Sequence, residues 1–254
     1  MMRQKTVRSL VAIALIALIA IVAISLNQQL ANRISPEVYE VDGQKIFGIV
    51  LDLTDESKFP HRNVSLPGNH DAALYIAEAF ASYGLESHES TPNYLQYYDG
   101  KKANVIGIVP GRDERLKDET IVIGAHFDTK AVFEGTEIVH EPGVDPIAMV
   151  NMDMVGSVLD NPIYICTVGH GDNPYPLEDA FAFCAEKLGI EVATAAIGRT
   201  DHRSFAARGI PAVQLFSDDT RFYHTAEDTP DKLDPDHLEE VGRLVVQWLS
   251  EAAN

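Results

Sequence analysis

The chain has 254 residues, of which 46% are hydrophobic and 23% charged, a composition typical of a globular domain with a sizeable core rather than a disordered chain. The 20 Lys and Arg residues are outnumbered by 38 Asp and Glu residues, which gives a formal net charge of -18. So acidic a chain argues against a nucleic-acid partner, because binding to phosphates depends on Lys and Arg residues that release counterions.

The first 26 residues are a candidate membrane signal. Residues 1–8 carry three basic residues and no acid, and residues 9–26 are apolar except for two serines near their ends. A helix over this run rises about 27 Å, close to the thickness of the hydrocarbon core of a bilayer. The basic residues predict a single-pass signal anchor with its N-terminus in the cytoplasm and the main domain outside it. A cleaved signal peptide is the alternative, although its apolar region usually has about 7–15 residues.

The remaining chain is expected to form a polar connector (27–44) and one domain (45–254). Apolar residues at helical spacing predict three helices, at 69–83, 177–188 and 235–252. Runs rich in β-branched residues predict five strands, at 102–109, 120–124, 147–152, 162–168 and 210–216. This alternation predicts an α/β fold with a mostly parallel central sheet and helices on both faces, preceded by the transmembrane helix.

The two cysteines, Cys166 and Cys184, suggest no chemistry of their own. Their spacing fits no zinc motif, and their neighbours are typical of a strand and a helix. We expect two buried free thiols, with a disulfide as the alternative outside the cytosol.

Polar residues that directly follow apolar strands are candidates for a functional site, because ligands of open α/β sheets bind beyond the carboxyl ends of the strands. His126 and Asp128 follow one predicted strand. Two residues apart on an extended segment, they point to the same side, so the carboxylate can orient an imidazole that binds a metal. Asp153 interrupts an apolar run, where an acid needs a partner to stay ionised. Tyr223 and His224 follow a later strand after a short loop.

Four motifs occur together with these residues. They are Gly-Ala-His-x-Asp at 124–128, Asn-x-Asp-Met-x-Gly at 151–156, Thr-Asp-His-Arg-Ser-Phe at 200–205 and Tyr-His-Thr-x-x-Asp-Thr at 223–229. In order and composition they resemble the M28 family of zinc aminopeptidases, over roughly residues 45–250.

The resemblance implies a zinc-exopeptidase-like fold and two zinc ions that share a bridging carboxylate and a water or hydroxide. Carried over to this sequence, His126 and Asp153 would ligate one zinc and His224 the other. Asp128 would hold the ring of His126 without touching the metal. Three more residues would line the site without being ligands: Asp201, His202 and Tyr223. Such metals lower the pKa of a bound water and polarise the scissile carbonyl, while a carboxylate base moves the proton.

The sequence departs from the family pattern between the first and second motifs. There the family has an Asp that bridges the metals and, after a helix and a strand, a Glu-Glu pair that supplies the base and a zinc ligand. Residues 129–152 contain no Glu-Glu pair, and Asp145 is their only Asp, which indicates an internal deletion. Glu137 is the candidate for the missing catalytic acid, with Thr136 in the position of the base. A surface loop acid is the alternative for Glu137.

Several functions stay open. A zinc-dependent exopeptidase of the aminopeptidase type would hydrolyse peptide amino termini outside the cytoplasm. A membrane-tethered pseudopeptidase or peptide-binding domain would account for the missing acids, and a shortened form of a normal enzyme would do so too. A glutaminyl cyclase uses one zinc, but its ligands also include acids from the missing stretch. A peptide is the expected partner of both the enzyme and the binding domain.

Overall fold

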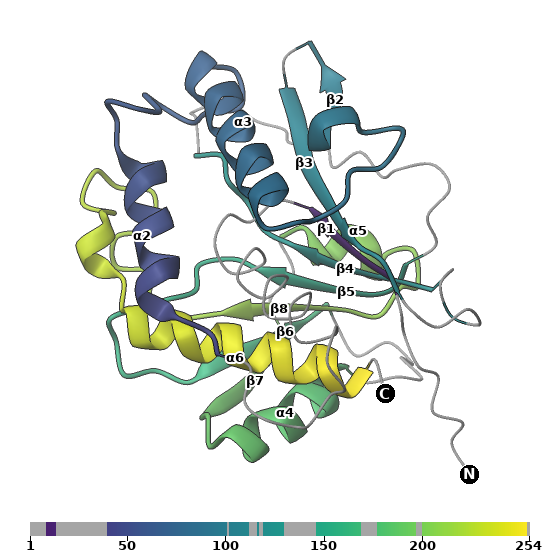
Figure 1. The fold of residues 1–254 in the computed structure, drawn as a ribbon. Coiled ribbons are helices and arrows are strands. Elements are labelled where there is room, and N and C mark those ends of the chain that lie inside the picture. The colour runs from purple at the N-terminus through teal and green to yellow at the C-terminus, as the bar shows by residue number, and fades with distance from the viewer. Residues whose placement is uncertain are drawn as a thin grey trace.

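The computed structural model describes residues 9–13, 40–100, 102–111, 116, 119–129, 146–168, 177–196 and 200–252, which form one eight-stranded sheet with helices packed against it (Figure 1). The strands are β1 (Ser9–Ile13), β2 (Leu95–Asp99), β3 (Lys102–Val109), β4 (Thr120–Gly124), β5 (Pro146–Met152), β6 (Ile163–Thr167), β7 (Val192–Ala196) and β8 (Ala212–Phe216). The helices are α2 (Gly43–Thr54), α3 (Pro67–Ser82), α4 (Leu177–Leu188), α5 (His202–Ala206) and α6 (Pro235–Ala252), with 3-10 turns at Pro92–Tyr94 and Pro230–Lys232.

The strand order in the sheet is β2-β3-β1-β4-β5-β8-β6-β7. The pairs β1–β4, β4–β5, β5–β8 and β6–β7 are parallel, and the pairs β2–β3, β1–β3 and β6–β8 are antiparallel. The sheet is therefore mixed and mostly parallel, which confirms the fold class expected from the sequence. The parallel strands β4 and β5 and their neighbour β8 form the centre, and their carboxyl ends lie at one edge.

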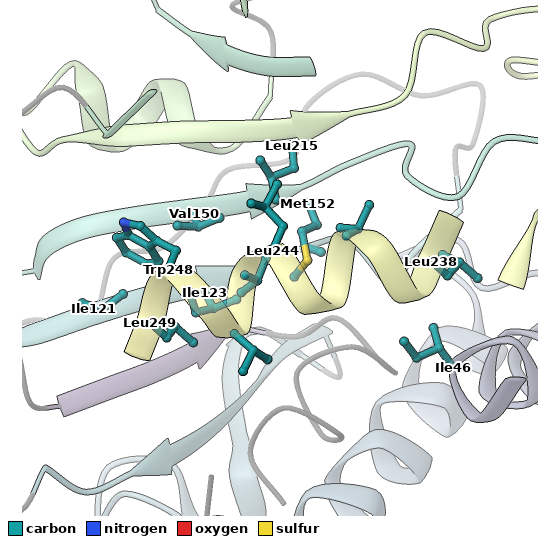
Figure 2. Packing of buried hydrophobic residues seen from close by; sticks show 14 of the residues in the cluster. Ile46, Ile121, Ile123, Val150, Met152, Leu215, Leu238, Leu244, Trp248 and Leu249 are labelled. Atoms are coloured by element: carbon teal, nitrogen blue, oxygen red, sulfur yellow. The ribbon is translucent and has the colours of Figure 1, made fainter. Parts of the chain in front are cut away.

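Helices cover both faces of this sheet. On one face α6 packs its apolar side against the central strands, with Leu244 and Trp248 directed at Val150 and its neighbours (Figure 2). On the other face the short helix α5 packs Phe205 against Val122 and the residues next to it. Successive side chains of a strand point to opposite faces, so β4 and β5 contribute to both layers. Every residue of β4 is buried, and in β5 only Ile147 is partly exposed.

The helix boundaries have local causes. α3 ends where Gly84 adopts a φ of +76°, a conformation that glycine reaches without strain, and Leu85 N then donates to Phe80 O at 3.0 Å. α2 was not expected from the sequence and begins within the predicted connector. The carboxylate of Asp42 accepts a hydrogen bond from Lys45 N at 3.0 Å and so starts this helix.

The amino-terminal segment differs from the sequence prediction. Ser9–Ile13, where the sequence predicted the start of a membrane helix, form strand β1 between β3 and β4; the rest of the predicted helix lies outside the described residues. Leu10 pairs with Val109 on one side and Ile121 on the other. A continuous apolar run suits a buried central strand as well as a helix, and its sequence does not distinguish the two. No helix in the described part of the chain has the length and hydropathy to cross a membrane.

Both cysteines are buried free thiols, as expected. Cys166 lies in β6 and Cys184 in α4. Burial raises the pKa of each thiol to about 11, so both are protonated at neutral pH and unsuited to nucleophilic or metal-binding roles.

Candidate functional site

The candidate site begins two residues beyond the end of β4. Ala125 and Phe127 are buried, so the alternation of the extended segment turns His126 and Asp128 to the opposite side together. His126 Nδ1 lies 3.0 Å from Asp128 Oδ1, the contact that the sequence predicted. A carboxylate only accepts, so Nδ1 carries a proton, and Nε2 is directed toward Asp201, whose Oδ1 is 3.7 Å away.

Two further carboxylates surround this imidazole. Asp153 follows β5 directly, and Asp201 precedes α5. Burial raises the pKa of both carboxyl groups, and the negative charge of Asp128 raises it further. The pKa of His126 is raised to about 9. The hydrogen bond to Asp128 and the negative charges of Asp201 and Asp153 raise it, and burial of the ring lowers it. The cluster thus places one imidazolium among three acids, and its net negative charge favours the binding of a cation.

The backbone of Asp153 is held by β8. Asp153 N donates to Leu215 O at 3.2 Å, and Gln214 Nε2 donates to Asp153 O at 3.4 Å. Met154 then adopts a φ of +58°, in the left-handed region, and accepts from Ser217 N at 2.9 Å. A non-glycine residue in this region costs roughly 1–2 kcal/mol. The turn therefore fixes the carboxylate of Asp153 at the end of the sheet at the expense of local strain.

His224 approaches the cluster from the loop after β8. Its side chain is exposed and stacks on Tyr223, with 3.5 Å between the ring centroids and 30° between the planes. Its backbone also adopts a left-handed φ of +60°. Its positive charge lowers the pKa of Asp153 and of Asp228, so His224 lies within electrostatic range of the cluster on its outer side. Tyr223 is thus placed beside His224.

Arg62 is a member of the site that the sequence did not indicate. Thr129 N donates to Arg62 O at 3.1 Å, and Asn63 Nδ2 donates to Thr129 O at 3.3 Å, so this loop is docked beside the segment that carries Asp128. Burial lowers the pKa of the guanidinium and the charge of Asp128 raises it. Asn69, at the start of α3, fixes the loop by donating to Arg62 O at 3.0 Å. No local pattern marks this contact, because the segments are far apart in sequence.

A buried polar network lies beneath the acids. Thr200 Oγ1 is 2.8 Å from Gln214 Oε1, 2.7 Å from His202 Nδ1 and 3.3 Å from Asn151 Nδ2. Asn151, His202 and Gln214 are at most 2% exposed. His202 therefore lies in the interior under Asp201 instead of lining the surface of the site. The sequence analysis assigned no role to Asn151 and Gln214. An amide side chain inside an otherwise apolar strand was the feature that could have pointed to them.

The family resemblance implied zinc, and the side chains are of the type zinc prefers. In the described part of the chain, however, no group of three or more His, Cys, Asp or Glu side chains is arranged to hold a metal ion. Catalytic zinc sites usually have three protein ligands, so the described residues do not by themselves complete a zinc centre. Glu137 and the other acids of residues 130–145 lie outside the described residues.

The sequence model of peptidase family M28 matches residues 136–249, which include three of the four motifs. Residues 136–249 of this chain thus resemble peptidase family M28. The match covers β5, α5 and the loop of His224, and thus most of the elements that form the site. This similarity supports a peptidase-like function. No curated protein matches the chain.

Solved structures show that this chain has a fold like that of known exopeptidases. It resembles the LapA aminopeptidase of Legionella pneumophila with a TM-score of 0.60 and 18% identity, over 84% of this chain and 75% of that one. A Zn-dependent exopeptidase from Parabacteroides distasonis gives a TM-score of 0.58 and 13% identity, over 82% and 97%. A glutaminyl cyclase from an Acidobacteriales bacterium gives 0.60 and 16%, over 87% and 99%. At these identities the likeness concerns the fold alone.

A shorter similarity has higher identity. The chain is 31% identical to an aminopeptidase from Aneurinibacillus sp. strain AM-1, over 42% of this chain and 26% of that one, with a TM-score of 0.39. The chain thus spans about a quarter of that protein. The comparison therefore does not assign the activity of that protein to this chain.

Proposed function

We propose that this chain is an M28-like exopeptidase of the aminopeptidase type that acts on the amino termini of peptides. The observation that carries the proposal is the cluster of His126 with Asp128, Asp153 and Asp201, at the carboxyl ends of β4 and β5. The cluster occupies the position where open α/β sheets bind ligands. Its excess of negative charge suits a peptide amino terminus, which is positively charged at neutral pH.

The charge of the cluster explains why an unblocked terminus would be preferred. Burial raises the pKa of both Asp153 and Asp201, although the positive charge of His126 lowers it. An ammonium group close to them would stabilise their ionised forms. An acetylated terminus carries no charge and gains none of this energy. Selectivity for free amino termini thus follows from the acids themselves.

Zinc is the cofactor that the similarity to this family suggests, and zinc dependence is part of the proposal. His126, Asp153 and His224 stay the proposed ligands, and Glu137 stays a proposed catalytic acid. Asp128 would keep the ring of His126 in one orientation through the 3.0 Å hydrogen bond.

The test combines metal content with turnover. The full-length chain is dialysed against micromolar zinc, its zinc content is measured, and release of the first residue is followed on a free and an N-acetylated peptide. We expect zinc-dependent release from the free peptide only, and its loss in His126→Ala. His88→Ala is the matched control, because His88 is an exposed histidine whose ring contacts only Ser90 among the described residues. No release at saturating zinc would overturn the proposal.

A second candidate function is a non-catalytic peptide-binding domain. It is favoured by the finding that no three-ligand group exists among the residues described. The carboxylates would then bind the peptide amino terminus without hydrolysing it. Calorimetric titration with a non-hydrolysed peptide distinguishes the two functions: binding that persists in a His126→Ala, His224→Ala variant supports the binding domain. A peptide with amino-terminal Gln tests the related cyclase activity in the same series.

We also propose that the chain is exported and tethered to a membrane by its amino-terminal apolar run, with the main domain extracytoplasmic. Its support is the basic and apolar pattern of residues 1–26. The pairing of Ser9–Ile13 as β1 is the competing arrangement, since the same residues cannot lie in a bilayer and in the sheet. Alkaline extraction of membranes decides between them: a chain released into the supernatant would refute the tether.

A further inference from the structure

The Thr200 hydroxyl joins β5, β8 and the first residue of α5 at one point. Asn151 of β5 and Gln214 of β8 are paired residues of neighbouring parallel strands, and their side chains both reach Thr200. His202, the first residue of α5, contacts the same oxygen through Nδ1. Asp201 lies between Thr200 and His202, so the residues on both sides of it are bound to each other.

The directions of these hydrogen bonds follow from the chemistry of the groups. Gln214 Nε2 donates to the carbonyl of Asp153, which fixes the amide with its Oε1 toward Thr200. Oε1 can only accept, so the single hydroxyl proton of Thr200 is donated to it. The Thr200 oxygen then has only lone pairs left, and it accepts from Asn151 Nδ2 and from His202 Nδ1.

We infer that Thr200 is a positioning residue that holds His202 with its proton on Nδ1 and thereby keeps the Asp201 carboxylate beside His126. The inference rests on the proposed function only where it concerns zinc and peptide. Its structural part, the tautomer and the placement of Asp201, stands on the four contacts of Thr200 and Gln214 alone.

The network couples the two buried acids of the cluster. One end of it is the backbone carbonyl of Asp153, bound by Gln214 at 3.4 Å. The other end is the turn that carries Asp201, whose Oδ1 lies 3.7 Å from His126 Nε2. Both acids thus depend on one hydroxyl, although neither touches it among the contacts described. Groups that orient the ligands of a metal typically change metal affinity by 10–100-fold when they are replaced.

Two substitutions test the hydroxyl group of Thr200 and the shape of its side chain independently. Thr200→Val keeps the volume and removes the hydrogen-bonding oxygen. Thr200→Ser keeps the oxygen and removes a methyl group. Asp201→Asn supplies the reference for a site in which the carboxylate no longer acts on His126. The full-length chain is labelled with 15N-histidine, and long-range 1H–15N spectra then report the tautomer of each ring.

In the unaltered chain we expect the Nδ1–H form of His202, together with the same form in Thr200→Ser. In Thr200→Val the proton should move to Nε2, and the His126 resonances should shift as they do in Asp201→Asn. Zinc affinity, measured by competition with a chelator, should fall at least about tenfold in Thr200→Val and stay within about threefold in Thr200→Ser.

Two results would overturn the inference about Thr200, and a third would refute only the proposed function. A wild-type His202 that carries its proton on Nε2 overturns the inference, even if no variant folds. So does a folded Thr200→Val with unchanged His126 resonances. A chain that neither binds zinc nor releases amino acids refutes the proposed function, while the tautomer and the His126 spectrum still test the role of Thr200.

Discussion

Asp128 raises the pKa of His126, and the substitution Asp128→Asn measures the size of this effect. The asparagine keeps the size of the side chain, and its Oδ1 can still accept from Nδ1–H, but the negative charge 3.0 Å from the ring is lost. Because the hydrogen bond to this carboxylate is the largest cause of the raised pKa of His126, the pKa should fall from about 9 toward its ordinary value.

The raised pKa of His126 makes the unfolding free energy depend on pH in a defined direction. The pKa of His126 in the folded chain lies above its value of 6.5 in the unfolded chain, so the protonated ring stabilises the fold below pH 6.5. This stabilisation is lost as the pH rises through about 9. The ring is 39% exposed, so water screens the interaction, and we expect roughly 1 kcal/mol rather than the full equivalent of the shift.

The assay is an NMR titration of the His126 ring together with urea unfolding at pH 6.5, 8 and 10. The unfolding free energy of Asp128→Asn should fall below that of the unaltered chain by the largest amount at pH 6.5 and by the smallest at pH 10. Glu227→Gln, which removes an exposed acid from a neighbouring loop, is the matched control and should change neither quantity.

A His126 ring that titrates near 6.5 in the unaltered chain would refute the reasoning. An unchanged pKa in Asp128→Asn would do the same, because it would assign the shift to the more distant acids.

Three further predictions concern the fold. Leu244→Ala, at a fully buried position of α6, should lower the unfolding free energy by about 2–5 kcal/mol in urea denaturation. Gly107→Ala should lower it by about 1–3 kcal/mol, because the new Cβ would lie 2.4 Å from Leu85 Cδ2; an unchanged midpoint would show that β3 can shift. Cys166 and Cys184 should not react with a thiol reagent at pH 8 until the chain is unfolded, because burial raises the pKa of each to about 11.

The central fold was predictable where burial leaves a continuous pattern. β3 and β4 have the predicted bounds: β4 is buried throughout, and β3 is buried over its central residues. α6 shows one apolar side over its whole length. The missed elements lack such a signal. β7 is a short edge strand with alanines, and α2 begins inside a segment whose composition is polar. Edge strands bury little, so their sequences are weakly constrained.

In the site, only contacts between residues close in sequence could be predicted. Alternation placed His126 and Asp128 on the same side, and the 3.0 Å contact confirms this geometry. The approach of Arg62 and the convergence on Thr200 depend on which strands are neighbours, in particular on β5 beside β8. Strand order is decided by the packing of the whole sheet and leaves no local trace in the sequence. The proposed roles of Asp153, His224 and Glu137 stay predictions.

The position of β1 has a consequence for how the chain is made. Its partners in β3 and β4 are synthesised about a hundred residues later, so the first strand of the chain must wait for its neighbours. Pairings of such long range form slowly. Until β1 is inserted, β3 and β4 present two unpaired edges in the middle of the sheet (Figure 1), the kind of surface that promotes aggregation. A chain translated without its first thirteen residues would keep that gap permanently, and its yield of soluble protein should fall accordingly.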